Sequence, residues 1–221
     1  GSIKYDPEGA VVPAIKIEEL HIVLALAGIG ETQPTLLAAS THAGEEIELG
    51  RVFLRLREQV RDLALLIVPR HVERRTEISA DLQSIGISPA LRSVPGSRVD
   101  ENAPVLVIDT TGELAAWQHL ATLVVVGKSF LAKGGQNPAE AALAQKPVLF
   151  GPHMENFRPL VDLLLKHRGA QQVADFAELE AACCALLKDG VKAKRMAQAG
   201  HGALAVHEGA TVRSVERLLG K

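Results

Sequence analysis

The chain has 221 residues, of which 47% are hydrophobic and 23% are charged, and its formal net charge at pH 7 is −2. This is the composition of a folded globular protein, and it excludes an intrinsically disordered chain. Aromatic residues make up only 3% of the chain. The near-neutral charge and the scarcity of aromatic rings both argue against a nucleic-acid-binding module.

The ends of the chain and its cysteines carry little chemistry. No run of 18 or more apolar residues predicts a membrane-spanning helix, and no basic-then-apolar signal peptide opens the chain. Gly1 and Ser2 are typical of a tag-cleavage remnant, so we expect one domain over residues 3–221. Cys183 and Cys184 are adjacent on a helical stretch and predict neither a disulfide framework nor a zinc site.

Short β-like runs alternate with helical stretches along the chain. Apolar runs predict strands at 22–27, 63–68, 90–93, 105–109, 123–127, 147–150 and 170–174. Amphipathic stretches predict helices at 45–60, 72–85, 113–120, 138–144, 158–167 and 177–188, with one or two closing helices within 191–219. Repeated strand–helix units with short connectors predict an α/β fold, a Rossmann-like, doubly wound parallel sheet flanked by helices. Ligands bind such sheets at the carboxyl ends of the strands, so the loops that follow the strands are the candidate site.

Two predicted helix starts carry polar residues that admit both a capping and a binding interpretation. Ser40 and Thr41 precede the helix predicted from Glu45, where free amides and hydroxyl donors are receptive to phosphate. A plain N-cap is the favoured interpretation when this segment is considered alone. Asp109 precedes Glu113 in a pattern that matches helix capping, which accounts for Asp109 and leaves the role of Glu113 ambiguous.

A basic segment follows the second predicted strand. Arg70 and His71 come directly after it, and Arg74 and Arg75 lie about one helical turn later. A cation at the carboxyl edge of a sheet suits a phosphate group, whereas exposed arginines more often form a solvated face. The position at the strand end favours a binding role for Arg70 and leaves the roles of Arg74 and Arg75 open.

The glycine-rich loop after the fifth predicted strand is the most informative segment. Gly134 and Gly135 allow a ligand to approach the backbone closely. Asn137 and Pro138 then predict a helix start whose free amides bind an anion, and Glu140 lies where its carboxylate can accept two sugar hydroxyls. The same pattern also fits a simple turn. It is not a Walker loop, because no Gly-Lys-Ser/Thr opens the helix, and it is not a dinucleotide fingerprint, because Gly-x-Gly-x-x-Gly is absent.

Six segments, taken together and in order, carry a family resemblance. They are IKYD, ASTHAGEE, LLIVPRHVER, DTTGELAAW, VVVGKSFLAKGGQNPAEAALAQKPVLFGPHMENF and GAQQVAD, and they span residues 3–175. In this combination the chain resembles the carboxyl-terminal half of the Kdo transferases. These bacterial enzymes move 3-deoxy-D-manno-octulosonic acid (Kdo) from CMP-Kdo to the lipid A precursor. The resemblance implies one half of a GT-B glycosyltransferase fold, the half that binds the nucleotide-sugar donor.

The resemblance also implies a set of donor-binding residues. The candidates are Ser40, Thr41, Glu45, Arg70, His71, Glu113, Lys128, Ser129, Gly134, Gly135, Gln136, Asn137, Glu140, Gly151, Pro152 and His153. Among them, Arg70 and His71 match the segment that lies against the donor phosphate, and Glu140 matches the acid expected on the ribose hydroxyls. Residues 151–153 match the loop near the base, and residues 40–45 match the loop that faces the interdomain cleft.

Three positions depart from the family pattern. Lys128 stands where a second glycine is usual, Gln136 where the family usually has histidine, and Ala141 where proline often follows the glutamate. Gln136 keeps a hydrogen-bonding side chain, and Lys128 adds a phosphate contact or narrows the loop. The implied donor is therefore CMP-Kdo or a related nucleotide sugar.

The family's other domain carries the acceptor site, the carboxylate base and the membrane anchor, and we expect none of these within the 221 residues. The implied reaction is inverting: an acceptor hydroxyl attacks the anomeric carbon, and Arg70 and the loop amides stabilise the leaving CMP phosphate. We expect no metal, no cofactor and no nucleic-acid partner. We expect the full-length enzyme at the cytoplasmic face of the inner membrane, and this piece alone to be soluble, to bind nucleotide weakly and to transfer nothing.

Two other functions stay open at this point. The chain also fits the donor domain of another GT-B transferase or a nucleotide-sugar epimerase, which a preference for UDP over CMP would indicate. It also fits a non-catalytic Rossmann-like interaction module, which unchanged nucleotide binding in the variants R70A and E140A would support.

Overall fold

The structure is a computed structural model that describes residues 12–207 together with 209, 210, 212, 215 and 216. Its strands are β1 (Thr35–Thr41), β2 (Ala64–Pro69), β3 (Ala90–Leu91), β4 (Val105–Val107), β5 (Leu123–Val126), β6 (Val148–Phe150) and β7 (Gln171–Gln172). Its helices are α1 (Ala14–Ala27), α2 (Glu45–Gln59), α3 (Arg75–Ser84), α4 (Leu114–Leu120), α5 (Ala139–Leu143), α6 (Arg158–Lys166), α7 (Phe176–Lys188) and α8 (Gly190–Ala203). Short 3-10 turns are η3 (Val72–Arg74), η4 (Glu155–Phe157) and η5 (Leu204–His207).

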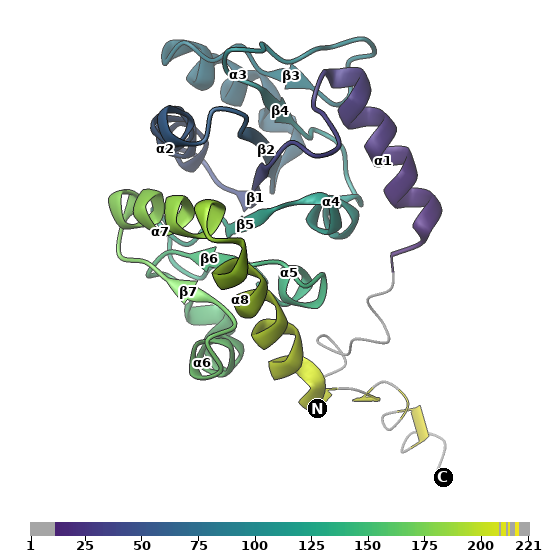
Figure 1. Cartoon of the computed structure of the whole chain (residues 1–221), viewed down its shortest axis with the longest axis vertical. Coiled ribbons are helices and arrows are strands. Elements are labelled where there is room, and N and C mark those ends of the chain that lie inside the picture. Colours follow the sequence, from purple (N-terminus) through teal and green to yellow (C-terminus); the bar gives the residue numbers. More distant parts are fainter. Residues whose placement is uncertain (1–11, 208, 211, 213–214, 217–221) are drawn as a thin grey trace.

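The seven strands form one sheet, parallel throughout, in the order β3-β4-β2-β1-β5-β6-β7 (Figure 1). Helices cover both faces of this sheet, which is why the strands are continuous apolar runs rather than alternating ones. Along β1, Leu36 and Ala38 face a core formed with α2, α3 and α7, whereas Leu37 and Ala39 face a core formed with α1, α4, α5 and α6. The predicted doubly wound α/β fold is therefore confirmed.

The strand order reverses between β1 and β5. After β1 the chain forms β2, β3 and β4 on one side of it, where β4 lies between β2 and the edge strand β3, and it then returns to place β5 on the other side of β1. The carboxyl ends of β1 and β5 are thus the topological switch point, the place where doubly wound sheets bind their ligands.

One predicted strand is wrong. Residues 22–27 form the end of α1, in which Leu24 is buried and Leu26 is 66% exposed. The segment is apolar on nearly every side, so its pattern carries no helical period, and tertiary packing of α1 against α4 decides its conformation. The first strand is β1, which places Ser40 and Thr41 at the end of a strand and not at a helix start.

The other predicted elements are confirmed, several of them shorter than expected. The helix predicted from residue 72 opens as η3 before α3 begins, and the strand predicted at 170–174 is reduced to β7. The closing helices are α8 and η5, and most of 208–219 lies outside the described residues, as do the suggested tag remnant and the IKYD segment.

Close packing of α8 depends on two glycines. An added Cβ at Gly200 would lie 2.7 Å from the carbonyl oxygen of Gly169, and one at Gly169 would lie 2.3 Å from the Cα of Gly200. Both contacts are with backbone, which has no side-chain rotamer to yield. We predict that Gly200→Ala lowers the free energy of unfolding by about 2–3 kcal/mol, measured by denaturant titration.

Gly202 on the same helix is the matched control. A Cβ there meets nothing within 4 Å, so Gly202→Ala is expected to leave stability unchanged or to raise it by up to ~1 kcal/mol, because alanine is the better helix former. Equal stability of the two variants would contradict the packing argument.

Candidate functional site

The switch point is built around the carboxylate of Glu45, which is 1% exposed at the start of α2. Its Oε2 accepts hydrogen bonds from the amides of His42 (3.0 Å) and Lys128 (2.7 Å), and its Oε1 accepts from those of Ser129 (3.0 Å) and Phe130 (3.2 Å). One side chain thus satisfies four backbone donors and joins the loop after β1 to the loop after β5.

A second buried carboxylate joins the loop after β1 to the start of α3. Glu46 is fully buried and accepts from Thr41 Oγ1 (2.9 Å) and from the guanidinium of Arg74 (2.8 and 3.3 Å), which also pairs with Glu77. Burial acts to lower the pKa of Arg74, but the hydrogen bonds to Glu77 and Glu46 raise it further than burial lowers it. The sequence did not decide between a binding role and a solvated role for Arg74. In the structure, its hydrogen bonds to Glu46 and Glu77 make it part of the framework that supports the site.

The backbones of the two switch-point loops touch. A Cβ at Gly127 would lie 2.7 Å from both the carbonyl oxygen of Ser40 and the Cα of Thr41, so only glycine fits there. Ser40 and Lys128 have φ angles of 55° and 52°, in the left-handed region. The positive φ of Lys128 explains why glycine suits this position, because glycine has no Cβ to crowd the left-handed conformation.

The loop after β5 is also joined to the loop after β6. Ser129 is fully buried; its hydroxyl donates to the carbonyl of Val126 (2.6 Å) and accepts from the amide of Gly151 (2.9 Å). Its carbonyl accepts from the amide of His153 (2.9 Å), and a Cβ at Gly151 would lie 2.2 Å from that same carbonyl oxygen. Ser129 and Gly151 therefore shape the edge of the site from within.

The glycine pair of the loop is held by hydrogen bonds inside the protein. The amide of Gly134 donates to Glu155 Oε2 (2.7 Å), its carbonyl accepts from the amide of Asn156 (3.1 Å), and the amide of Gly135 donates to the carbonyl of Lys128 (3.0 Å). Hydrogen bonds from its own amide and from that of Gly134 lower the pKa of Glu155. Sequence reasoning missed Glu155, although it lies in the GPHMENF end of the longest motif, because only residues 151–153 of that end were assigned a role.

A cluster of two histidines and one glutamine lies where the loops after β1, β2 and β5 meet. Gln136 Nε2 lies 3.2 Å from His42 Nε2, and the rings of His42 and His71 form an edge-to-face pair with centroids 5.7 Å apart. Burial, followed by the charge of Lys128, lowers the pKa of His42, so the ring is neutral at pH 7. His42 was not among the predicted donor residues, although it follows Thr41 directly.

Two cations at this edge have no side-chain partner among the residues that the structure describes. Arg70 donates its amide to the carbonyl of Thr41 (3.0 Å), but its guanidinium and the ammonium of Lys128 make no hydrogen bond or ion pair with the described part of the chain. A pocket of about 120 Å³ beside Arg70 is lined by residues that include Ser40 and Thr110. These cations are available to an anion.

The carboxylate of Glu140 has no partner in the described part of the chain. Glu140 lies on α5, just after the loop in which Asn137 Oδ1 accepts from the amide of Ala139 (3.0 Å), and it is partly buried. No described residue donates a hydrogen bond to its carboxylate, and burial raises its pKa. The helix begins at Ala139, one residue later than predicted.

Two acids that follow β4 accept hydrogen bonds from other residues of the protein. Glu113, a predicted donor residue, accepts from Lys16 Nζ (2.8 Å) and Thr110 Oγ1 (2.6 Å) and so joins α1 to this loop. Although burial acts to raise it, these hydrogen bonds lower the pKa of Glu113. The capping interpretation of Asp109 is wrong, because its carboxylate accepts from the amide and hydroxyl of Ser93 (2.8 and 2.5 Å).

The capping interpretation of Ser40 and Thr41 is also wrong. The N-cap of α2 is Gly44, and no side chain makes a capping hydrogen bond there. Within the described residues, no group of three or more histidine, cysteine or acidic side chains is arranged to hold a metal ion. None of the helices in the same ranges combines the length and apolar character needed to cross a membrane.

Comparison with known proteins relates the chain to sugar transferases, although no protein-family model matches it. The chain is 31% identical over 222 residues to the 3-deoxy-D-manno-octulosonic acid transferase of Bordetella pertussis and 32% identical over 219 residues to that of Haemophilus influenzae. Each alignment covers 99% of this chain and 50% of the relative. The chain therefore spans about half the length of these curated relatives.

Solved structures agree with the sequence comparison. The C-terminal CMP-Kdo binding domain of WaaA from Acinetobacter baumannii matches with a TM-score of 0.74 and 25% identity, over 87% of this chain and 99% of that domain. The C-terminal domain of the group 1 glycosyl transferase LpcC from Francisella tularensis, 12% identical over 91% of this chain and 96% of that one, shares the fold with a TM-score of 0.60. By sequence over nearly its whole length and by fold, the chain belongs to the 3-deoxy-D-manno-octulosonic acid transferase family and corresponds to its carboxyl-terminal, GT-B half.

Proposed function

We propose that this chain is the donor-binding half of a Kdo transferase and binds CMP-Kdo at the carboxyl ends of β1, β2, β5 and β6. The observation that carries the proposal is the pattern of unpaired groups. Most polar groups of this edge are satisfied within the protein, whereas Arg70, Lys128 and Glu140 have no partner among the described residues. Two cations and one acceptor are complementary to a phosphate and a ribose.

Side chains, and not the glycine amides, meet the donor phosphate in this proposal. The amides of Gly134 and Gly135 already donate to Glu155 and to a backbone carbonyl. Arg70 presents a planar set of donors that matches phosphate oxygens, and Lys128 adds a point charge across the switch point. Both cations stabilise the negative charge that develops on CMP as it leaves.

Glu140 binds the ribose hydroxyls. Its carboxylate is an acceptor with two oxygens, and no donor from the described residues competes for them. Burial disfavours the charged form of Glu140. Hydrogen bonds from two ribose hydroxyls offset this free-energy cost of burying the charge. The loop at 151–153 then lies beside the base, and Gln172 Nε2 fixes it by donating to the carbonyls of Gly151 (3.1 Å) and Pro152 (3.2 Å).

The transfer itself needs the other half of the protein. An acceptor hydroxyl on the lipid A precursor attacks the anomeric carbon of Kdo with inversion, while the bond to the CMP phosphate breaks. The general base that takes the hydroxyl proton, the acceptor site and the association with the cytoplasmic face of the inner membrane belong to that other half. No metal and no cofactor take part in this scheme.

Glu140→Gln separates binding from stability. The variant keeps the shape but weakens two charge-assisted hydrogen bonds, so the Kd for CMP, measured by calorimetry, is expected to rise about 10- to 100-fold. Because burial raises the pKa of Glu140, the ionised group costs stability above its folded pKa and costs nothing below its unfolded pKa. The variant should therefore unfold at a higher temperature than the wild type at pH 7 and at the same temperature near pH 4.

Glu58→Gln, on the exposed end of α2, is the control for this experiment. It should leave the affinity for CMP unchanged. Wild-type affinity of Glu140→Gln for CMP would remove Glu140 from the donor site.

Lys128→Gly relieves strain and removes a cation. Glycine adopts the φ of 52° without cost, so the free energy of unfolding should rise by about 1 kcal/mol, while CMP affinity falls. Arg168 has a φ of 57° after α6, remote from the site, and Arg168→Gly should stabilise to a similar extent without changing CMP affinity. Unchanged CMP affinity in Lys128→Gly would show that Lys128 does not contact the phosphate.

Nucleotide preference and turnover test the proposal as a whole. The chain should bind CMP more tightly than UDP in parallel calorimetric titrations, and it should transfer no Kdo from CMP-Kdo to a lipid A precursor by itself. A preference for UDP would indicate a different nucleotide sugar, and turnover by this chain alone would show that the base lies within it.

A further inference from the structure

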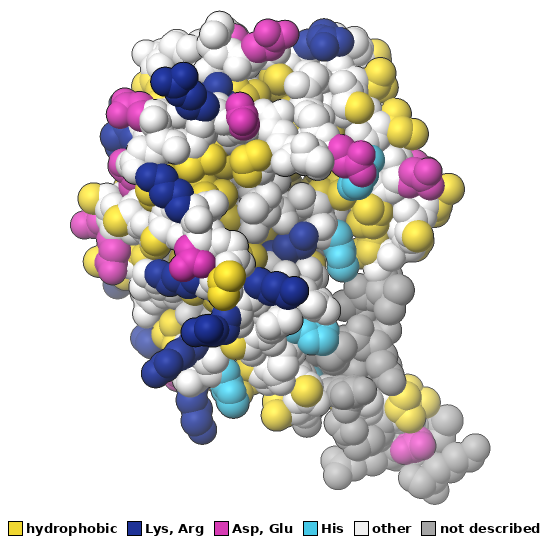
Figure 2. Space-filling view, viewed as in Figure 1, with side chains coloured by type: hydrophobic (Ala, Val, Ile, Leu, Met, Phe, Trp, Pro, Cys, Tyr) yellow, Lys and Arg dark blue, Asp and Glu magenta, His cyan; other side chains and the backbone are white. Residues whose placement is uncertain are grey.

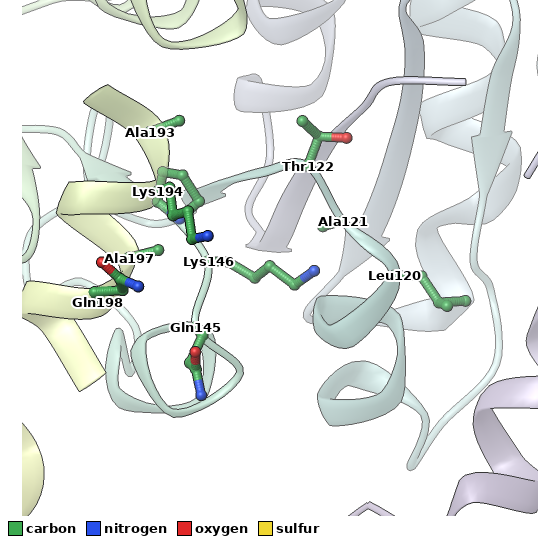
Figure 3. A pocket seen from close by; sticks show the side chains of 10 residues that line it. Leu120, Ala121, Thr122, Gln145, Lys146, Ala193, Lys194, Ala197 and Gln198 are labelled. Carbon is green, nitrogen blue, oxygen red and sulfur yellow. The ribbon is translucent and has the colours of Figure 1, made fainter. Parts of the chain in front are cut away.

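A second cavity lies at the opposite edge of the sheet from the donor site. It has a volume of about 380 Å³ and is lined on one side by residues that precede β5 and β6, among them Thr122 and Lys146, and on the other by α8, which contributes Lys194 (Figure 3). The amino ends of β5 and β6 open here, whereas the donor loops leave their carboxyl ends. The cavity is therefore a separate site, and nothing in the proposed donor binding uses it.

The described residues that line this cavity include two lysines and no acid. Lys146 and Lys194 come from opposite walls, and neither has a hydrogen-bond or ion-pair partner within the described ranges. Gln145 and Gln198 add side-chain amides. Figure 3 shows Lys146 extending from the turn before β6 into the space between α8 and the segment at 120–122. Such a lining is suited to an anion.

Lys146 is held in an unfavourable environment. The side chain is partly buried, and burial lowers its pKa, with no ion-pair partner from the described residues to compensate. Its charge in turn contributes, after burial, to lowering the pKa of His119 on α4. Figure 2 shows lysine and arginine side chains gathered over the part of the surface where Figure 1 places α6, α7 and α8. A bound anion would offset the cost of burying this charge.

We propose that this cavity binds a small phosphate-bearing molecule, with the phosphate between the ammonium groups of Lys146 and Lys194. The remaining walls are apolar and include Leu120, Ala193 and Ala197, so they pack against the organic part of the ligand. The volume is in the range of small-molecule sites, about 300–1,000 Å³. The phosphate belongs either to a free metabolite or to a lipid headgroup.

The test uses inorganic pyrophosphate as the probe, in a chain that carries Arg70→Ala and Lys128→Ala so that the donor edge does not contribute. Calorimetry at low salt is expected to show binding that Lys146→Met and Lys194→Met each weaken by about tenfold or more. Lys192→Met is the matched control, because Lys192 is exposed on α8 and does not line the cavity. It should bind pyrophosphate as tightly as the parent chain.

Methionine keeps the aliphatic length of lysine and removes an unpaired, partly buried charge, so Lys146→Met should fold and be at least as stable as the parent. A flotation assay with vesicles of phosphatidylcholine, with and without phosphatidic acid, shows whether the bound phosphate belongs to a lipid headgroup or to a free metabolite. Binding to phosphatidic acid that Lys146→Met abolishes assigns the site to a headgroup, and binding to pyrophosphate alone assigns it to a free phosphate. No binding in either assay, or an equal loss in Lys192→Met, overturns the proposal.

Discussion

The switch point at the carboxyl ends of β1 and β5 depends on the buried carboxylate of Glu45. A charged oxygen pair taken out of water must be fully hydrogen-bonded, and Glu45 obtains its four donors from two loops that are far apart in the sequence. The loops after β1 and β5 therefore form a single rigid unit. Gly127 completes the unit, because the backbones approach so closely that no side chain fits between them.

This constraint divides the polar residues of the edge into two groups. Glu45, Glu46 and Ser129 have their hydrogen bonds within the protein and build the shape of the site. The side chains of Arg70 and Glu140 make no hydrogen bond or ion pair with the described residues and are available to a ligand. Because the scaffold is hydrogen-bonded within the protein, the backbones of these loops are held in place before a ligand arrives, which lowers the entropic cost of binding.

The two edges of the same sheet carry different chemistry. At the carboxyl edge, Arg70 follows β2, and Lys128 and Glu140 follow β5, which supplies cations and an acid for the proposed phosphate and ribose. At the amino edge, Lys146 and Lys194 line a cavity without any acid. Both follow from the doubly wound topology, since α5 and the turn after it connect the donor loop of β5 to the amino end of β6. Neither edge depends on a residue of the other, so the two proposed sites can be tested independently.

The sequence by itself determined the fold class, nearly all of the elements after residue 45, and the family, because apolar periodicity and ordered motifs are local signals. It also singled out Arg70 and Glu140, which stand at recognisable positions after a strand and a glycine pair. Only the tertiary structure decided that residues 22–27 are helical and that Asp109 binds Ser93. It likewise placed Glu45 and Ser129 inside the scaffold. The physical reason is that hydrogen-bond partners 16 to 84 residues away are brought together by packing, which no local pattern encodes.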